Sequence, residues 1–178
     1  ALIPLLKGEV KAHIHCHRAD DITTALRICK EFGLKPLLIH CTEGHLIADM
    51  LGEAHAEAVV GPIICDRGKP ELAHASLENA GKLCAAGVKT AICTDHPETP
   101  INFLTAGAAY CCKYGMPKNE ALKGLTITAA ELGGFADRTG SVTVGKDADL
   151  ILLDDDPFEI MTNVCMTMIN GKIVFERK

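Results

Sequence analysis

Short apolar runs alternate with helix-like segments over the first hundred residues, and this alternation limits the chain to a few folds. Runs with the composition of buried strands occupy residues 9–16, 35–41, 58–64 and 88–93. Strands that are apolar almost throughout are covered on both faces, which is typical of a parallel sheet joined by right-handed crossovers. The pattern therefore predicts an α/β protein in which each strand is followed by a helix.

Helix start and stop signals separate these runs. Asp20 and Asp21 supply acidic residues for a helix start, and Gly33 is suited to end that helix. Thr42 is predicted to cap a second helix, and Ser76 a third. Each helix would carry the chain back to the start of the next parallel strand.

The chain changes character beyond Thr99. The spacing of apolar residues predicts helices over 103–114 and 118–132. Three short β-like runs follow, at residues 149–153, 165–169 and 172–175. The pair Asn170-Gly171 between the last two runs is a strong hairpin signal. We therefore expect a small antiparallel β element after the α/β body.

Composition and charge exclude two classes of partner. The 178 residues carry a formal net charge of −5 and contain no basic run, which argues against a nucleic-acid partner. We find no apolar span of membrane length and no signal peptide, which argues against a membrane partner. Nine cysteines without a C-x-x-C pair predict free thiols in a reducing cytoplasm. Cys16, Cys41 and Cys93 fall at strand ends and are expected to be small packing residues.

Three histidines recur in the first predicted strand at the side-chain period of a β-strand. His13, His15 and His17 would therefore point to one face. Imidazole is the commonest metal ligand and titrates near neutral pH, so the spacing indicates metal or proton chemistry nearby. A half-buried strand whose histidines hydrogen-bond to neighbours would give the same spacing. His13 lies deeper in the strand and is expected to be a core or outer-shell histidine.

Polar residues also stand at the ends of later predicted strands. His40 ends the second strand, and Asp95 and His96 follow the fourth. Ligands gather at the carboxyl ends of parallel strands, where these residues would join His15 and His17. Such nitrogen and oxygen donors suit zinc, iron or another divalent ion with one position left open for water. Taken singly, His40 as a hydrogen-bonded strand-end histidine and Asp95 as a helix cap are the ordinary alternatives.

Basic residues near these strand ends are candidates for substrate binding. Arg67 and Lys69 lie in the loop after the third predicted strand, Arg18 follows the first, and His96 follows the fourth. They favour a small polar or anionic substrate. A solvated charged loop is the alternative interpretation of Arg67 and Lys69.

Several motifs occur in the order found in a known family. They are His15-Cys16-His17-Arg18, Ile39-His40-Cys41-Thr42-Glu43, Lys69-Pro70-Glu71-Leu72, Thr94-Asp95-His96-Pro97, Val144-Gly145-Lys146-Asp147-Ala148-Asp149-Leu150 and Ile169-Asn170-Gly171-Lys172. Over nearly its whole length the chain resembles the second half of the amidohydrolase superfamily, nearest its imidazolonepropionase-like branch.

The resemblance implies a metal-dependent hydrolase on a (β/α)8 barrel, which cleaves a cyclic amide or related C–N bond with metal-activated water. It implies that His15 is a metal ligand from the fifth barrel strand and His40 one from the sixth. Asp95 would be the eighth-strand aspartate that binds metal and carries protons, so that His40 and Asp95 are the expected catalytic residues. One or two divalent ions are implied, with zinc preferred and iron as the alternative.

The resemblance also implies half of an enzyme. Residues 1–135 would form strands 5 to 8 of the barrel with their helices, and residues 136–178 the last strands of a composite β-sandwich domain. A complete barrel takes about 250 residues, and the family's first-strand His-x-His pair is not found ahead of the fifth strand. We expect a fragment that is inactive alone and that associates with itself or with the missing amino-terminal half. A non-catalytic half-barrel assembly module with relic site residues is the alternative.

Overall fold

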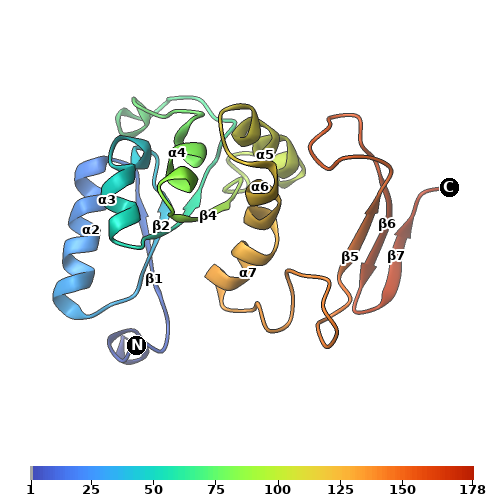
Figure 1. Cartoon of the computed structure of the whole chain (residues 1–178), viewed down its shortest axis with the longest axis horizontal. Coiled ribbons are helices and arrows are strands. Elements are labelled where there is room, and N and C mark those ends of the chain that lie inside the picture. The colour runs from blue at the N-terminus through green and yellow to red at the C-terminus, as the bar shows by residue number, and fades with distance from the viewer. Residues whose placement is uncertain (1) are drawn as a thin grey trace.

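The computed structural model describes residues 2–178 and contains two separate β-sheets (Figure 1). The first sheet has four strands in the order β1-β2-β3-β4, and every neighbouring pair is parallel. Its strands are β1 (Ala12–Cys16), β2 (Pro36–His40), β3 (Glu57–Val60) and β4 (Lys89–Ile92). The predicted α/β architecture with a parallel sheet is confirmed, and the strands are shorter than the apolar runs that predicted them.

Helices connect the parallel strands and continue beyond the last one. They are α1 (Ile3–Leu6), α2 (Ala19–Phe32), α3 (Ala48–Glu53), α4 (Asn79–Ala85), α5 (Leu104–Lys113), α6 (Lys118–Leu125) and α7 (Ile127–Gly133). Single 3-10 turns lie at Gly44–Leu46, Pro70–Leu72 and Ile101–Phe103. Helix α2 begins with Asp20 and Asp21 in its first turn and ends at Gly33 in the left-handed conformation, as its sequence predicted.

Three helix predictions were wrong in detail. Ser76 is not the cap of α4, whose N-cap residue is Glu78; the Ser76 hydroxyl accepts the N–H of Glu78 at 3.2 Å. Thr42 does not cap a helix, because the chain turns sharply at His40 and Cys41 and the Thr42 hydroxyl bonds to another segment. The predicted helix over 118–132 is two helices, because Thr126 leaves the helical region with φ −129° and ψ −102°. Its N–H instead closes a short turn onto the carbonyl of Lys123.

The main hydrophobic core lies between the sheet and the helices α2 to α6. Leu38 and Val60 from the central strands are fully buried there, together with Ile22 of α2 and Leu83 of α4. Burial of each such side chain stabilises the fold by about 1.5–3 kcal/mol relative to exposure. The apolar spacing of the helices is thus explained by contact with one face of the sheet.

The opposite face of the sheet carries a second, smaller cluster. Leu37 of β2 and Ala91 of β4 pack there against Leu132 of α7. Adjacent residues of β2, Leu37 and Leu38, therefore point into different clusters, and both are buried. Burial on both faces is the reason that the strand sequences are continuously apolar rather than alternating.

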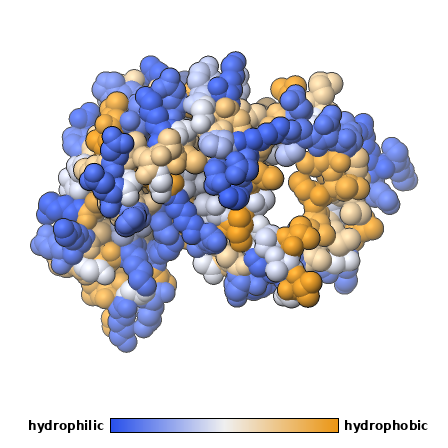
Figure 2. Space-filling model, in the orientation of Figure 1, coloured by the Kyte–Doolittle hydropathy of each residue, from blue (hydrophilic) through white to orange (hydrophobic). Residues whose placement is uncertain are grey.

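The second sheet is antiparallel and lies at one end of the molecule (Figure 1). Its strands are β5 (Leu150–Leu153), β6 (Val164–Ile169) and β7 (Lys172–Glu176). Asn170 and Gly171 both have positive φ in the β6–β7 turn, which confirms the predicted hairpin. Apolar side chains remain exposed over this sheet, among them Ile151 at 60% and Val174 at 58% (Figure 2).

Two further sequence predictions concern membrane spans and cysteines. Within residues 2–178, no helix is both long and apolar enough to cross a bilayer. All nine cysteines are free thiols, as predicted, and Cys16 and Cys41 are buried in the core.

Candidate metal centre

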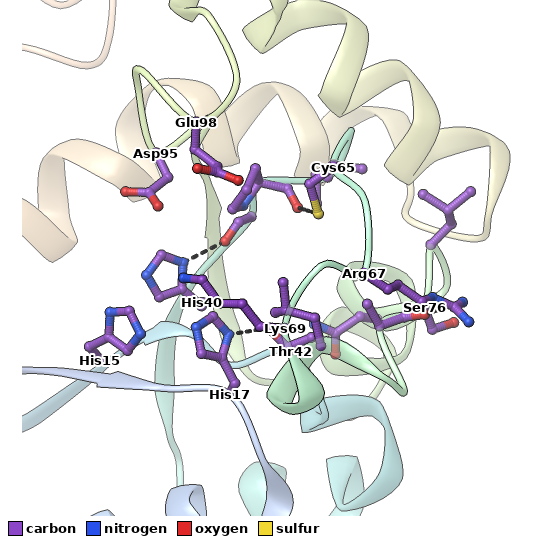
Figure 3. A pocket seen from close by; sticks show the side chains of 17 residues that line it. His15, His17, His40, Thr42, Cys65, Arg67, Lys69, Ser76, Asp95 and Glu98 are labelled. Carbon is purple, nitrogen blue, oxygen red and sulfur yellow. Dashed lines mark hydrogen bonds between the residues drawn. The ribbon is translucent and has the colours of Figure 1, made fainter.

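Three imidazoles meet at the carboxyl edge of the parallel sheet (Figure 3). His15, His17 and His40 each present a ring nitrogen within 4.8 Å of the others. Their ring centroids are 4.4–4.8 Å apart, and the rings of His17 and His40 stack at 19°. Three nitrogen donors at this spacing form a set that zinc, iron or another divalent ion accepts.

The register of two neighbouring strands brings these imidazoles together. Cys16 of β1 pairs with His40 of β2, so the two strands end side by side. His15 is the penultimate residue of β1, and His17 follows the strand end. His40 has a φ of 70°, a conformation that is uncommon outside glycine and that persists where the surrounding structure holds it.

Hydrogen bonds to two of the rings set which nitrogen faces the cluster. The Nδ1 of His40 lies 2.7 Å from the carbonyl oxygen of Gly61. A carbonyl only accepts, so Nδ1 carries the proton and Nε2 keeps its lone pair. The Nδ1 of His17 lies 2.7 Å from the Thr42 hydroxyl. The Nε2 of His17 is buried without a hydrogen-bond partner among residues 2–178.

Burial favours the neutral form of His17. Burial is the largest cause that lowers the pKa of His17 below its usual 6.5, and the neighbouring His40 and His15 lower it further. A neutral imidazole is the form that binds a metal ion. The adjacent thiols are less suited, because burial raises the pKa of Cys41 to about 12 and that of Cys16 to about 11.

The imidazoles line a cavity of about 300 Å³ that also collects residues from the later loops (Figure 3). Asp95 enters from the turn after β4 with a φ of 52°, and Glu98 follows it. Among residues 2–178, the group whose ligand atoms all lie within 4.8 Å of one another consists of the three histidines, and Asp95 stands outside it. The cavity therefore combines a cluster of nitrogen donors with two separate carboxylates.

The loop between β3 and α4 supplies the basic residues of the cavity. Arg67 and Lys69 both line it and are exposed at its rim. A guanidinium nitrogen of Arg67 donates to the carbonyl of Ala75 at 2.7 Å, which holds this loop in a closed shape. The Nζ of Lys69 lies 4.0 Å from a carboxylate oxygen of Glu71.

The other two basic candidates lie elsewhere. Arg18 is exposed and pairs with the carboxylate of Asp20 at 2.9 Å. His96 is also exposed, and its Nδ1 accepts the backbone N–H of Ile101 at 3.3 Å. Neither side chain lines the cavity. The geometry therefore gives their predicted role in substrate binding no support.

The buried carboxylate of Glu43 connects three segments of the chain through hydrogen bonds. Glu43 is 5% exposed, and its Oε2 accepts the N–H of Ala19 at the start of α2 at 2.8 Å. Its Oε1 lies 2.8 Å from the Nδ1 of His74 in the loop before α4. Burial alone would raise the pKa of Glu43, but the bonds to Ala19 and His74 outweigh it and lower that pKa.

Sequence reasoning missed part of this site. His17 was recognised at a strand end but not assigned as a ligand, although its spacing from His15 was the available signal. The Gly61 carbonyl and the Thr42 hydroxyl had no sequence signal for their contacts with the imidazoles. His13 was expected to be a core or outer-shell histidine; it is exposed and outside the cluster, so the core position was wrong and the outer-shell position stays a prediction.

Comparisons with known proteins identify the family and the fold of the chain. The chain is 40% identical to a crystallised amidohydrolase from Thermotoga maritima MSB8, with a TM-score of 0.93 over 98% of this chain and 45% of that one. It is 28% identical to an imidazolonepropionase from Fusobacterium nucleatum, over 89% of this chain and 45% of that protein. It is 26% identical to amidohydrolase tasK from Hapsidospora irregularis, over 99% of this chain and 18% of that protein.

The chain thus spans less than half the length of each of these three relatives. The sequence model of the amidohydrolase family matches residues 9–174, which include the parallel sheet, the three-histidine cluster and the antiparallel sheet except the last two residues of β7. The resemblance seen in the motifs is therefore confirmed, and the chain belongs to the amidohydrolase family.

Proposed function

We propose that this chain carries the metal-binding part of a hydrolase that cleaves a cyclic amide or a related C–N bond. The main observation in support of this proposal is the cluster of His15, His17 and His40 at the carboxyl edge of the parallel sheet. Membership of the amidohydrolase family, which is generally metal-dependent, and the similarity to an imidazolonepropionase support the same chemistry.

The residues present fit a divalent cation. The Nε2 of His17 is buried and has no hydrogen-bond partner among the described residues, since the carboxylate of Glu71 is 3.7 Å away; an ion would supply that partner. The Nε2 of His40 has a free lone pair because Nδ1 donates to Gly61. We therefore propose His17 as a donor beside His15 and His40. Zinc is the first expectation and iron the second, with one or two ions.

When bound, such an ion supplies a water of lowered pKa and polarises the carbonyl of the scissile bond. The chain's own residues then have three tasks. Thr42 holds the ring of His17 by its Nδ1, and the Gly61 carbonyl holds that of His40. Asp95 lines the same cavity, and its carboxylate is proposed to take a proton from the attacking water and to pass it to the leaving nitrogen.

The rim of the cavity is proposed to select the substrate. Arg67 and Lys69 place two positive charges at its rim, so a small polar or anionic compound is the proposed ligand. The fixed guanidinium of Arg67, which already bonds to Ala75, lowers the entropy cost of holding such a compound. Arg18 and His96 are not given this role, since both lie outside the cavity lining.

We further propose that the parallel sheet corresponds to strands 5 to 8 of a (β/α)8 barrel, which residues 1–135 would form with their helices. Residues 136–178 would then be strands of a composite β-sandwich. The open edges of β1 and β4 and the 45% coverage of the Thermotoga maritima chain support this proposal. A complementary half would supply the rest of the barrel. The exposed apolar sheet favours a second candidate, a non-catalytic half-barrel assembly module.

One experiment separates these candidates. The chain is loaded with zinc and assayed on an imidazolone and on linear N-acyl amines, alone and after co-production with an amino-terminal amidohydrolase half-barrel. A hydrolase predicts stoichiometric zinc and turnover that requires both halves. Association with the complement without zinc binding or turnover would contradict the hydrolase and favour the assembly module.

A further inference from the structure

We propose that Asn79 is a positioning residue that fixes the turn carrying His40 and Thr42 at the candidate metal centre. This inference rests on the proposed metal-binding function and adds to it a residue that does not itself belong to the imidazole cluster. Asn79 is the first residue of α4, 34 positions beyond the end of the turn at His45.

The turn after β2 is backbone in an unfavourable conformation. His40 and Cys41 follow one another with φ of 70° and 47°, both in the left-handed region. Residues other than glycine adopt this region at an energetic cost, and they stay there only when neighbouring groups hold them. Something outside the turn must therefore stabilise it.

Asn79 spans that turn with both ends of its amide. Its Nδ2 donates to the carbonyl of Cys41 at 3.0 Å, and its Oδ1 accepts the backbone N–H of His45 at 2.8 Å. The side chain is 6% exposed, so neither bond competes with bulk water. A single buried amide thus pairs one backbone group at the start of the turn and one at its end.

The packing leaves this amide little freedom. A Cβ at Gly44, within the turn, would stand 3.3 Å from the Oδ1 of Asn79 and 2.8 Å from the Sγ of Cys41. Next to Asn79, Ala80 is 1% exposed and belongs to the main core, so that helix α4 anchors the amide. Backbone bonds from Cys41 and Glu43 tie the turn to the end of β1, and Asn79 ties it to the core through α4.

The turn in question presents two of the groups that build the metal centre. His40 stands at its start, and the Thr42 hydroxyl within it lies 2.7 Å from the Nδ1 of His17. Loss of the Asn79 amide would leave the Cys41 carbonyl with the N–H of Gly44 alone and the N–H of His45 without its acceptor, and both groups could then shift. Outer-shell partners of metal-ligating histidines commonly change metal affinity 10–100-fold, and we expect an effect of that size here.

The test compares three variants of the 178-residue chain. Asn79→Ala removes the amide, and Asn79→Leu removes both hydrogen bonds while nearly conserving volume. Thr90→Val is the matched control, because Thr90 is also 6% exposed and its hydroxyl donates to the backbone carbonyl of Val88 at 2.9 Å. The measurements are the Co²⁺ dissociation constant from visible absorption, urea unfolding, and amide hydrogen exchange.

Both Asn79 variants should bind Co²⁺ at least tenfold more weakly. Thr90→Val should bind Co²⁺ as the wild type does, even if its urea unfolding midpoint falls as far as those of the Asn79 variants. The amide of His45 should lose its protection in both Asn79 variants, whereas that of Cys93, which donates to the carbonyl of Val60, should keep it.

Unchanged Co²⁺ affinity in Asn79→Leu would overturn the inference, as would an equal loss in Thr90→Val. Hydrogen exchange distinguishes a failure of the positioning role of Asn79 from a failure of the proposed metal-binding function. If the wild-type chain bound no Co²⁺, the proposed metal site would fail. Continued protection of the His45 amide in Asn79→Leu would then overturn the positioning role on its own.

Discussion

The imidazole Nδ1 of His40 lies 2.7 Å from the carbonyl oxygen of Gly61, and this contact joins the ends of two adjacent parallel strands. It fixes the tautomer of His40, because a carbonyl accepts and does not donate. Gly61 has a φ of 134°, and a Cβ there would stand 2.1 Å from the carbonyl oxygen of Cys93 after β4. The orientation of one candidate ligand thus depends on a close backbone approach between the ends of β3 and β4.

Gly61→Ala should therefore disturb both stability and metal binding. The strained φ and the collision with Cys93 should lower the free energy of unfolding by about 1–3 kcal/mol and weaken zinc affinity about tenfold. Urea unfolding and zinc titration measure the two effects. Gly115→Ala is the control, since Gly115 has a φ of 106° but open space around its Cβ position. Normal zinc affinity in Gly61→Ala would contradict the role assigned to the carbonyl.

The three clustered histidines should differ from His13 in metal content. His15→Ala and His17→Ala each remove a nitrogen of the cluster, so zinc bound per chain should fall at least tenfold at limiting zinc. His13→Ala removes an exposed imidazole outside the cluster and should leave zinc content unchanged. Elemental analysis after dialysis gives the comparison. Equal losses at His13 and His15 would mean that the ligand is wrongly assigned.

Asp95→Asn should abolish turnover in the complemented enzyme without unfolding it. Asparagine has nearly the same shape and tolerates the φ of 52° at this position, whereas it cannot accept a proton. Loss of the proposed proton carrier should lower kcat by about 10²–10⁴-fold. Glu98→Gln, which neutralises another carboxylate of the cavity, should have a smaller effect. Full activity in Asp95→Asn would remove this residue from the mechanism.

The contribution of Glu43 to the stability of the fold should decrease at acidic pH. Its bonds to Ala19 and His74 outweigh the effect of burial and hold the pKa below the usual 4.5. The carboxylate therefore contributes its full stability above about pH 4.5, and that stability is lost as the pH falls through the lower folded value. The difference in unfolding free energy between wild type and Glu43→Gln should shrink between pH 6 and pH 3. A difference that does not change with pH would show that the charge is not stabilising.

The chain should associate when it is isolated. The four-stranded parallel sheet leaves one edge each of β1 and β4 unpaired, and side chains such as Val174 and Phe175 are about half exposed. Unpaired edges and apolar faces favour pairing with another chain. Sedimentation at micromolar concentration should therefore detect a symmetric dimer, or a complex when a complementary half is present. A monomer with one cooperative unfolding transition would argue against this expectation.

The order of strands and helices could be predicted because it depends on local sequence signals. Apolar runs of strand length, acidic helix starts and the stop at Gly33 act within a few residues, so their positions could be predicted. The Asn170-Gly171 hairpin is local for the same reason. Local signals failed at Thr42, because its hydroxyl is used by His17, 25 positions earlier, rather than by a helix.

The candidate site divides in the same way. Strand periodicity and parallel topology predicted that His15, His17, His40 and Asp95 share one edge of the sheet. The tertiary structure was needed to show that His17, and not Asp95, completes the cluster, and that the Gly61 carbonyl orients His40. These contacts depend on distances of a few ångströms between strands and turns, and hydrophobic periodicity carries no information about such distances.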